Sequence, residues 1–442
     1  MKIKMMTPYL VMALSAISLS AKTAGNLNLR VEADKPILKA AETQRAIIKV
    51  SVMPEPVATA TERNPVNLAI VVDRSGSMQG TKIEQARQAA IEAVQRLGRS
   101  DIISIISYAD QARTDVAATS VSENAPIIRA IQNIQANGNT ALYAGVNQGA
   151  AELRKHLEEG GYFNRIILLS DGLANSGPST PADLKRLGRA LAREGVSVST
   201  IGIGNDYNED LMAGLAQTGD GNTYFVENYR DLPRIFQDEL GDVLNVAAHQ
   251  VEIEIRCQEG IVPLRVIGRE ASIRGNRVNL DIQQLYGEQE KYVLLEVEVP
   301  AASSGEERAL VDVDVHYTDF SNQQRYTVHG DLTVRYSSDD TEITDHANVE
   351  VAEAYAKNEV AVALEAAIEL ADAGNTEAAA ERMQAAQSTL LSVNSTYSSA
   401  AIGAQADWAE DQAKEIQQHG MDKRGRKLYR AKSYQVSNQQ KE

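Results

Sequence analysis

The segment VVDRSGSM, residues 71–78, ends an apolar run on a carboxylate and then presents two hydroxyls at alternate positions. Asp73, Ser75 and Ser77 are spaced two residues apart, and Gly76 separates the serines. Side chains of these types occur in three kinds of site: around a nucleophilic serine, in a loop that cradles phosphate, or around a metal cation. The remainder of the chain discriminates among the three.

A nucleophilic serine requires a histidine base and an orienting acid, and it commonly lies in a G-x-S-x-G turn. The segment RSGSM is not such a turn, and the six histidines stand in no recognisable partner motif. A phosphate loop requires G-x-x-x-x-G-K-[ST], or G-x-G-x-x-G after a strand, and the sequence offers neither. Both a serine hydrolase and a nucleotide-binding protein are therefore disfavoured.

A cation site agrees better with the residue types. Hard cations such as Mg²⁺ take oxygen ligands in an octahedral array and retain several waters. Serine hydroxyls ligate without adding charge, while a neighbouring aspartate neutralises the ion. A D-x-S-x-S match by itself is a weak signal, because average composition produces one in roughly a tenth of chains this long.

The sequence in and around this segment resembles that of the von Willebrand factor type A (VWA) family. The resemblance lies in the stretches DRSGSM, GNTALYAGV, SDGLANSG and STIGIGNDYNEDLMAGLA. The resemblance implies a metal-ion-dependent adhesion site with five members: Asp73, Ser75, Ser77, Thr140 and Asp171. Ser75, Ser77 and Thr140 would then be direct ligands, and Asp73 and Asp171 would act mostly through water. Mg²⁺ is the expected ion, and Ca²⁺ or Mn²⁺ accept similar ligands.

The elements that must position these residues lie in residues 67–245. Apolar strand candidates alternate there with stretches of helical period, which predicts an α/β domain with a doubly wound, mostly parallel sheet. Ligands of such sheets bind at the carboxyl ends of the strands, near the switch point of the strand order. The strands that end at Asp73 and Asp171 both deliver a carboxylate to that edge.

The segments on either side have different patterns. Residues 25–66 and 246–340 alternate polar and apolar residues, and we expect them to form one antiparallel β-sandwich into which the α/β domain is inserted or which flanks it. Residues 345–420 are rich in Ala and Glu with helical periodicity, and they predict a helical hairpin. Residues 421–442 carry seven Lys or Arg, and we expect a disordered basic tail or a contact with an acidic partner.

Composition and the N-terminus bear on location and partners. A net charge of −16 argues against nucleic-acid binding, which requires a basic face. Residues 1–24 resemble a secretory signal, so we expect an exported, periplasmic or extracellular protein without a membrane span once the signal is removed. The only cysteine, Cys257, excludes an intramolecular disulfide and is expected to be buried and unreactive.

The resemblance implies a protein that binds without catalysis. Its expected partner is a protein that presents an Asp or Glu carboxylate to the bound ion, in an adhesion or scaffold role in the cell envelope. One alternative is a structural envelope-assembly protein with a stabilising ion. Another is a metal-dependent hydrolase or channel-associated component, although the sequence contains no H-E-x-x-H.

Overall fold

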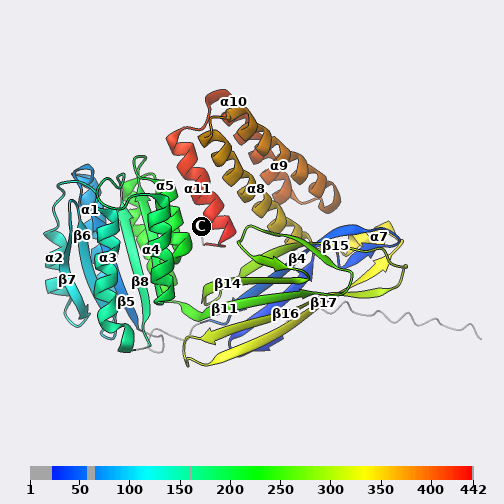
Figure 1. Cartoon of the computed structure of the whole chain (residues 1–442), viewed down its shortest axis with the longest axis horizontal. Coiled ribbons are helices and arrows are strands. Elements are labelled where there is room, and N and C mark those ends of the chain that lie inside the picture. The colour runs from blue at the N-terminus through cyan, green and yellow to red at the C-terminus, as the bar shows by residue number, and fades with distance from the viewer. Residues whose placement is uncertain (1–21, 57–64, 160, 441–442) are drawn as a thin grey trace, which may run out of the picture.

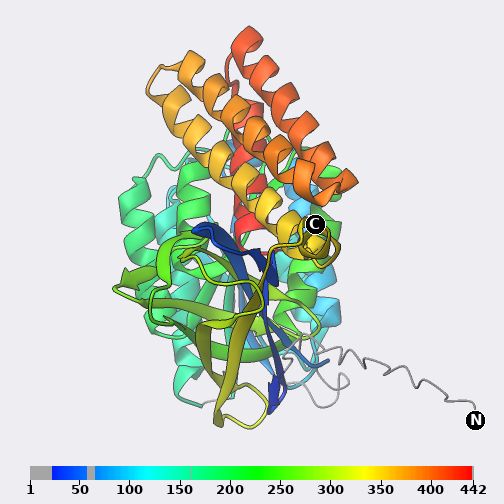
Figure 2. The ribbon, with the colours of Figure 1, turned by 90° about the vertical axis from the view of Figure 1, so that its right-hand side faces the viewer.

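The computed structural model describes residues 22–56, 65–159 and 161–440. Three parts lie together: a domain with helices on both faces of a sheet, a β-sandwich, and a group of long helices above the sandwich (Figure 1). Figure 2 shows the long helices standing over the sandwich from a second direction. The predicted signal, residues 1–24, lies almost entirely outside the described residues, and so stays a prediction.

The first part contains a six-stranded sheet with the order β10-β9-β8-β5-β6-β7. Its neighbouring strands pair in parallel, except that β7 runs antiparallel at one edge. All residues of β5 and β9 are buried, because helices cover both faces of the sheet. The strands are Val66–Asp73 (β5), Ile102–Tyr108 (β6), Ala112–Ser120 (β7), Phe163–Ser170 (β8), Val196–Ile203 (β9) and Asp220–Val226 (β10).

Three helices pack on each face of this sheet. One core contains buried residues from β5, α1, α2 and α6, and the other contains residues from β5, α3, α4 and α5. These helices are Thr81–Arg96 (α1), Asn124–Gln132 (α2), Leu142–Leu153 (α3), Pro181–Arg193 (α4), Glu209–Thr218 (α5) and Leu232–Val243 (α6). The doubly wound architecture is confirmed, and β7, α2 and α5 are elements that the sequence periodicity did not indicate.

The sandwich is built from both sides of the α/β domain in sequence. Its first sheet has the order β1-β2-β4-β15-β12 and its second β13-β14-β11-β16-β17-β3. β4 (Gln44–Pro54) pairs with β15 (Lys291–Val299) over nine residue pairs, and β3 (Ile37–Lys39) pairs with β17 (Arg325–Ser337). The α/β domain is therefore an insertion within the β domain, as predicted.

The other sandwich strands hold one shared apolar core, with their apolar residues facing the opposite sheet. Cys257, at the end of β11, lies in this core, and burial raises its pKa to about 11. These strands are Lys22–Ala24 (β1), Leu27–Ala33 (β2), Val246–Cys257 (β11), Val262–Ile267 (β12), Ser272–Arg274 (β13), Arg277–Tyr286 (β14) and Glu307–Asp319 (β16).

The helical part is larger than the predicted hairpin. A short helix, α7 (Asp340–Asp345), is followed by α8 (Val349–Asp372), α9 (Thr376–Tyr397) and α10 (Ala400–His419). Gly374 has a φ of 80° between α8 and α9, so the break between the first two helices lies where the sequence placed it. A third helix, α10, packs with them around a core rich in alanine. Among the described residues, no helix is long and apolar enough to cross a membrane.

The prediction of a disordered C-terminal tail is wrong. Lys423–Ser437 form helix α11, which lies between α8 and the α/β domain beside α5 (Figure 1). Tyr429 and Tyr434 are buried, and Arg430 pairs with Asp210 and Glu365. Four basic side chains of this segment, those of Arg424, Arg426, Lys427 and Arg430, pair with acids of the same chain, which is why a polar sequence forms an ordered helix here.

Buried charges join the three parts below α11. Arg165 and Glu239 form a salt bridge of 3.1 Å with both side chains inaccessible to solvent. Lys291, on β15, donates to the carbonyl of Asn438 at the end of α11, at 2.5 Å. Burial raises the pKa of Asp220 to about 6, although Arg165 and Lys291 oppose this shift. Among the described residues, Asp220 Oδ2 has no hydrogen-bond partner.

Asp220→Asn should increase stability at pH 8. The folded-state pKa of about 6 lies above the ordinary aspartate pKa of 3.8, so folding favours the neutral carboxyl. The penalty for ionisation is absent below about pH 4, grows as the pH rises through 6, and is complete above it. An amide removes that penalty, and Asn tolerates the φ of 57° at this position. We expect a gain of roughly 1–2 kcal/mol at pH 8 that shrinks toward pH 4, measured by urea unfolding.

The matched control is Asp345→Asn, at an exposed position, which should change stability by less than about 0.5 kcal/mol at either pH. A variant Asp220→Asn that is less stable than the wild-type chain at pH 8 would contradict this account of the buried carboxyl.

Candidate metal centre

The first loop of the site follows β5. Asp73 is the last residue of that strand and is buried, and its Oδ1 accepts a hydrogen bond from the Ser75 amide at 2.8 Å. This bond turns the chain into a short 3₁₀ helix, Gly76–Met78. The turn brings the hydroxyls of Ser75 and Ser77 to within 3.0 Å of each other.

The loop after β8 adds the second carboxylate. Asp171 is completely buried, and its Oδ1 accepts a hydrogen bond from the Ser77 hydroxyl at 2.7 Å. Its other oxygen lies 2.5 Å from the Lys82 ammonium at the start of α1. Ser170, the residue before it, donates to Asp73 Oδ2 at 2.9 Å. The loops after β5 and β8 are thus joined by direct hydrogen bonds at the carboxyl edge of the sheet.

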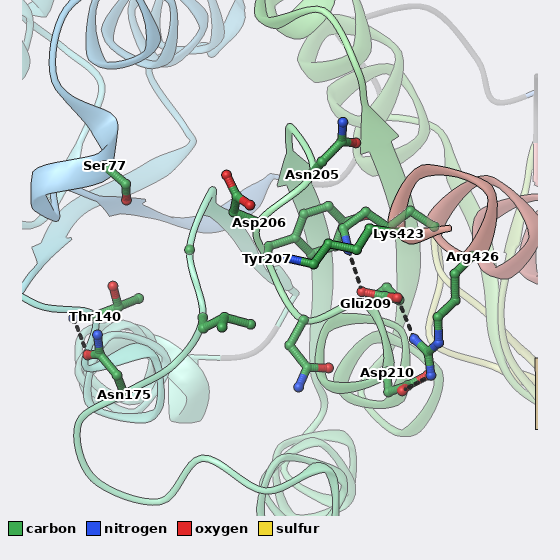
Figure 3. Close-up of a pocket in the computed structure, with 14 residues that line it drawn as sticks. Ser77, Thr140, Asn175, Asn205, Asp206, Tyr207, Glu209, Asp210, Lys423 and Arg426 are labelled. Atoms are coloured by element: carbon green, nitrogen blue, oxygen red, sulfur yellow. Dashed lines mark hydrogen bonds and ion pairs between the residues drawn. The ribbon is translucent and has the colours of Figure 1, made fainter. Parts of the chain in front are cut away.

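Thr140 enters from a third loop, just before α3. It is 3% exposed, and its amide donates to Asn175 Oδ1 at 2.9 Å. A Cβ on Gly172 would lie 3.3 Å from Thr140 Oγ1 and 3.4 Å from Ser77 Oγ, so both hydroxyls approach the same point of the backbone. Figure 3 shows the Thr140 hydroxyl directed toward Ser77. All five predicted residues therefore come together.

Backbone hydrogen bonds hold the loop after β5 against the loop that carries Thr140. The amide of Gly76 donates to the carbonyl of Gly138 at 2.9 Å, and the amide of Asn137 donates to the carbonyl of Arg74 at 2.6 Å. The side chain of Asn139 donates to Asp110 at 2.6 Å. These contacts fix the position of Thr140 relative to the two serines.

The donor set is suited to a hard cation. Burial raises the pKa of Asp73, and the nearby charge of Asp171 adds to this, although hydrogen bonds from Ser75 and Ser170 oppose it. Two buried carboxylates beside three hydroxyls form a region where positive charge is stabilised. No group of three or more His, Cys, Asp or Glu side chains placed to hold a metal occurs in the described part of the chain. Three of the five oxygen donors here are hydroxyls, which such a group does not include.

A cavity of about 520 Å³ opens beside these loops. Ser77 and Thr140 line one end of it, and Lys423 and Arg426 of α11 line the other (Figure 3). The site thus opens toward a space large enough for side chains of another molecule.

Comparison with known proteins agrees with this geometry. A family model of the von Willebrand factor type A domain matches residues 67–238. Residues 67–238 are a VWA domain. Domains of this family are typically protein-interaction modules that depend on a metal ion.

Relatives of the VWA domain occur in bacteria and mammals. An uncharacterised Escherichia coli protein, YfbK, is 30% identical over 230 residues, which are 51% of this chain and 40% of that protein. An uncharacterised Synechocystis protein, sll0103, is 25% identical over 59% of this chain and 64% of its own length. Inter-alpha-trypsin inhibitor heavy chain H3 of the rat is 28% identical over 43% of this chain and 22% of its own. The chain therefore spans less than two thirds of each of these relatives.

Two solved structures share the fold of nearly the whole chain. A von Willebrand factor type A protein from Catenulispora acidiphila has a TM-score of 0.67 at 18% identity, over 95% of this chain and 98% of that one. The ArnB paralog VWA2 from Sulfolobus acidocaldarius has a TM-score of 0.58 at 18% identity, over 94% and 99%. The combination of VWA domain, sandwich and helices is thus a fold that other chains share.

Sequence reasoning missed three residues that support the site. Lys82 donates to Asp171, Ser170 donates to Asp73, and the side chain of Asn175 accepts from the amide of Thr140. Lys82 and Ser170 lie within the segments DRSGSMQGTK and LLSDG, so their proximity to the motif was a usable signal. Asn175 also lies near the motif, in SDGLANSG, but its contact with Thr140 exists only once the loops before α3 and after β8 are packed together.

Proposed function

We propose that this protein is a metal-dependent protein-binding module, in which a divalent cation bound by the VWA domain captures an Asp or Glu carboxylate of a partner protein. The observation that carries the proposal is the convergence of three hydroxyls and two buried carboxylates from three loops beside an open cavity. No catalytic step is part of this function.

The five residues would have two different roles toward the ion. Ser75, Ser77 and Thr140 would hold the ion directly as neutral oxygen donors, and Asp73 and Asp171 would balance its charge mostly through water. When bound, the ion supplies a positive centre with an open position for a carboxylate. Mg²⁺ suits this oxygen-only set, and Ca²⁺ or Mn²⁺ suit it as well. Lys82 neutralises part of the Asp171 charge. The residues around the ion therefore carry little negative charge, and the bound ion would keep enough positive charge to attract a carboxylate of the partner.

The location belongs to the same proposal. The signal-like segment at residues 1–24 supports export to the periplasm or beyond, with an adhesion or scaffold role in the cell envelope. The net charge of −16 supports a local, ion-mediated contact with an acidic partner over a broad electrostatic one, since the two proteins would otherwise repel.

Affinity capture from an envelope extract tests the function. The wild-type chain should retain a partner with Mg²⁺ and release it with EDTA, and Ser75→Ala/Ser77→Ala should retain none. The deciding step is made on the captured partner: replacing one of its Asp or Glu residues by the amide should abolish binding. If every such replacement left metal-dependent binding intact, carboxylate capture would be wrong. A metal-dependent peptidase activity that the double variant loses would instead favour the hydrolase.

A structural ion is the second candidate, favoured by the burial of Asp73 and Asp171 side by side. Under the binding proposal, saturating Mg²⁺ should raise the melting temperature by only a few degrees, since a ligand at about 100 times its Kd contributes about 2.7 kcal/mol. Under the structural alternative, EDTA should unfold the VWA domain at room temperature. Melting curves with Mg²⁺ and with EDTA, followed by circular dichroism, distinguish the two.

A further inference from the structure

The cavity beside the metal centre is not formed by the VWA domain alone. Its far wall is the first turn of α11, a helix more than 180 residues later in the chain than the last site residue, Asp171. Lys423 and Arg426 line this wall, and the loop before α5 forms the floor with Tyr207 (Figure 3). Any partner bound at the metal therefore faces α11.

Some basic side chains of this wall are paired with acids and one is not. Lys427 donates to Glu209 at 2.7 Å, and Arg426 binds Asp210 at 2.6 Å. Burial raises the pKa of Asp210, but Arg426 and Arg430 outweigh it and lower that pKa. Lys423, by contrast, is exposed, and its ammonium has no hydrogen bond or ion pair within the described residues. Lys423 is thus a cation at the cavity that pairs with no acid among the described residues.

Packing contacts hold the first turn of α11, which carries Lys423, in a fixed position beside the candidate metal centre. The Lys427 ammonium lies 5.0 Å from the centre of the Tyr207 ring. That ring packs on Gly202 so closely that a Cβ there would lie 2.2 Å from it. Glu209, two residues after the tyrosine, is held by Lys427 and Arg426. The first turn of α11 is therefore held rigidly beside the loop that borders the site.

We propose that α11 is the second half of the partner-binding surface, and that Lys423 binds a second acidic side chain of the partner whose first carboxylate occupies the metal centre. The preferred partner is then a protein segment with two acidic residues a few positions apart. The side chain of Leu173, which is 59% exposed, lines the same cavity and offers the partner an apolar contact. This inference rests on the proposed function, because it assigns the partner class of the same site.

Asp206 should have the opposite effect to Lys423 on an acidic partner. It lines the same cavity, is exposed, and has no ion pair or hydrogen bond among the described residues. It repels an acidic partner, so Asp206→Asn should strengthen binding of a segment with two acids, whereas a basic partner would lose affinity in that variant.

Fluorescence anisotropy with labelled peptides tests the inference. The probes are Gly/Ser peptides that carry one Asp, or two Asp separated by one to four residues, each measured with Mg²⁺ and with EDTA. We expect the best two-acid peptide to bind about fivefold more tightly than the one-acid peptide. Lys423→Glu should remove that advantage and weaken the one-acid peptide much less, because that peptide has no second acid for Lys423 to bind. An acid in the first turn of a helix is favourable, so α11 should remain folded in this variant.

The matched control is Lys357→Glu, the same change at an exposed position of α8 outside the cavity, which should bind every peptide like the wild-type chain. Equal affinity for one-acid and two-acid peptides, with Mg²⁺ dependence retained, would overturn the role of α11 and leave carboxylate capture standing. Failure of every peptide to bind in a Mg²⁺-dependent way would overturn both.

Discussion

The double variant Ser75→Ala/Ser77→Ala should bind Mg²⁺ at least a hundredfold more weakly than the wild-type chain. The two hydroxyls lie 3.0 Å apart, and Ser77 also orients Asp171 through a hydrogen bond of 2.7 Å. The variant loses two donors and the orientation of a third, and loss of an orienting contact alone typically costs ten- to a hundredfold in metal affinity. Isothermal titration with MgCl₂ measures the change directly.

The control for this prediction is Ser388→Ala/Ser395→Ala, two exposed serines of α9, which should leave Mg²⁺ affinity unchanged. The double variant at the site should remain folded, because the alanines remove polar atoms and fill no new space. A site variant that binds Mg²⁺ within about threefold of the wild-type chain would show that the ion is held elsewhere.

Arg426→Glu should detach α11 from the VWA domain. The guanidinium of Arg426 is 19% exposed and pairs with Glu209, Asp210 and Asp372 at once. A glutamate at this position would leave four carboxylates together with only Lys427 and Arg430 to balance them. We expect a loss of about 2–3 kcal/mol of unfolding free energy, since removing one partner of a partly buried ion pair leaves the others uncompensated. Urea unfolding measures the loss.

Hydrogen exchange gives the structural readout of the same variant. Amides of Lys423–Ser437 should exchange faster, while those of β5 and β8 in the sheet should keep their protection. Arg424→Glu is the matched control, because Arg424 lies on the same helix and makes one exposed pair with Glu227. It should leave the unfolding free energy close to that of the wild-type chain. Equal effects of the two substitutions would show that α11 is held by its apolar side alone.

The candidate metal centre could be predicted from the sequence, because its members lie in short motifs that resemble the VWA family. Asp73 and Asp171 end continuous apolar runs, and such runs form buried parallel strands wherever helices cover both faces of a sheet. Carboxyl ends of parallel strands share an edge, so order along the chain was enough to bring the two loops together. The edge strand β7 was missed because its residues are half exposed and follow no strict alternation.

The C-terminal helix α11 could not be predicted from the sequence. The basic composition of residues 421–442 describes charge but not what neutralises it, and a solvated tail and a docked helix have the same composition. Arg426 and Lys427 meet Glu209 more than two hundred residues earlier in the chain. That contact exists only because the sandwich and α8 place α11 beside α5.

By itself, the sequence determined the α/β fold, which follows from apolar periodicity, and the five candidate metal ligands, which its short motifs give through their resemblance to the VWA family. Only the tertiary structure decided that α11 is ordered and that its Lys423 lines the cavity. Local patterns specify elements and their ends, whereas the pairing of charges across more than two hundred residues depends on how those elements pack.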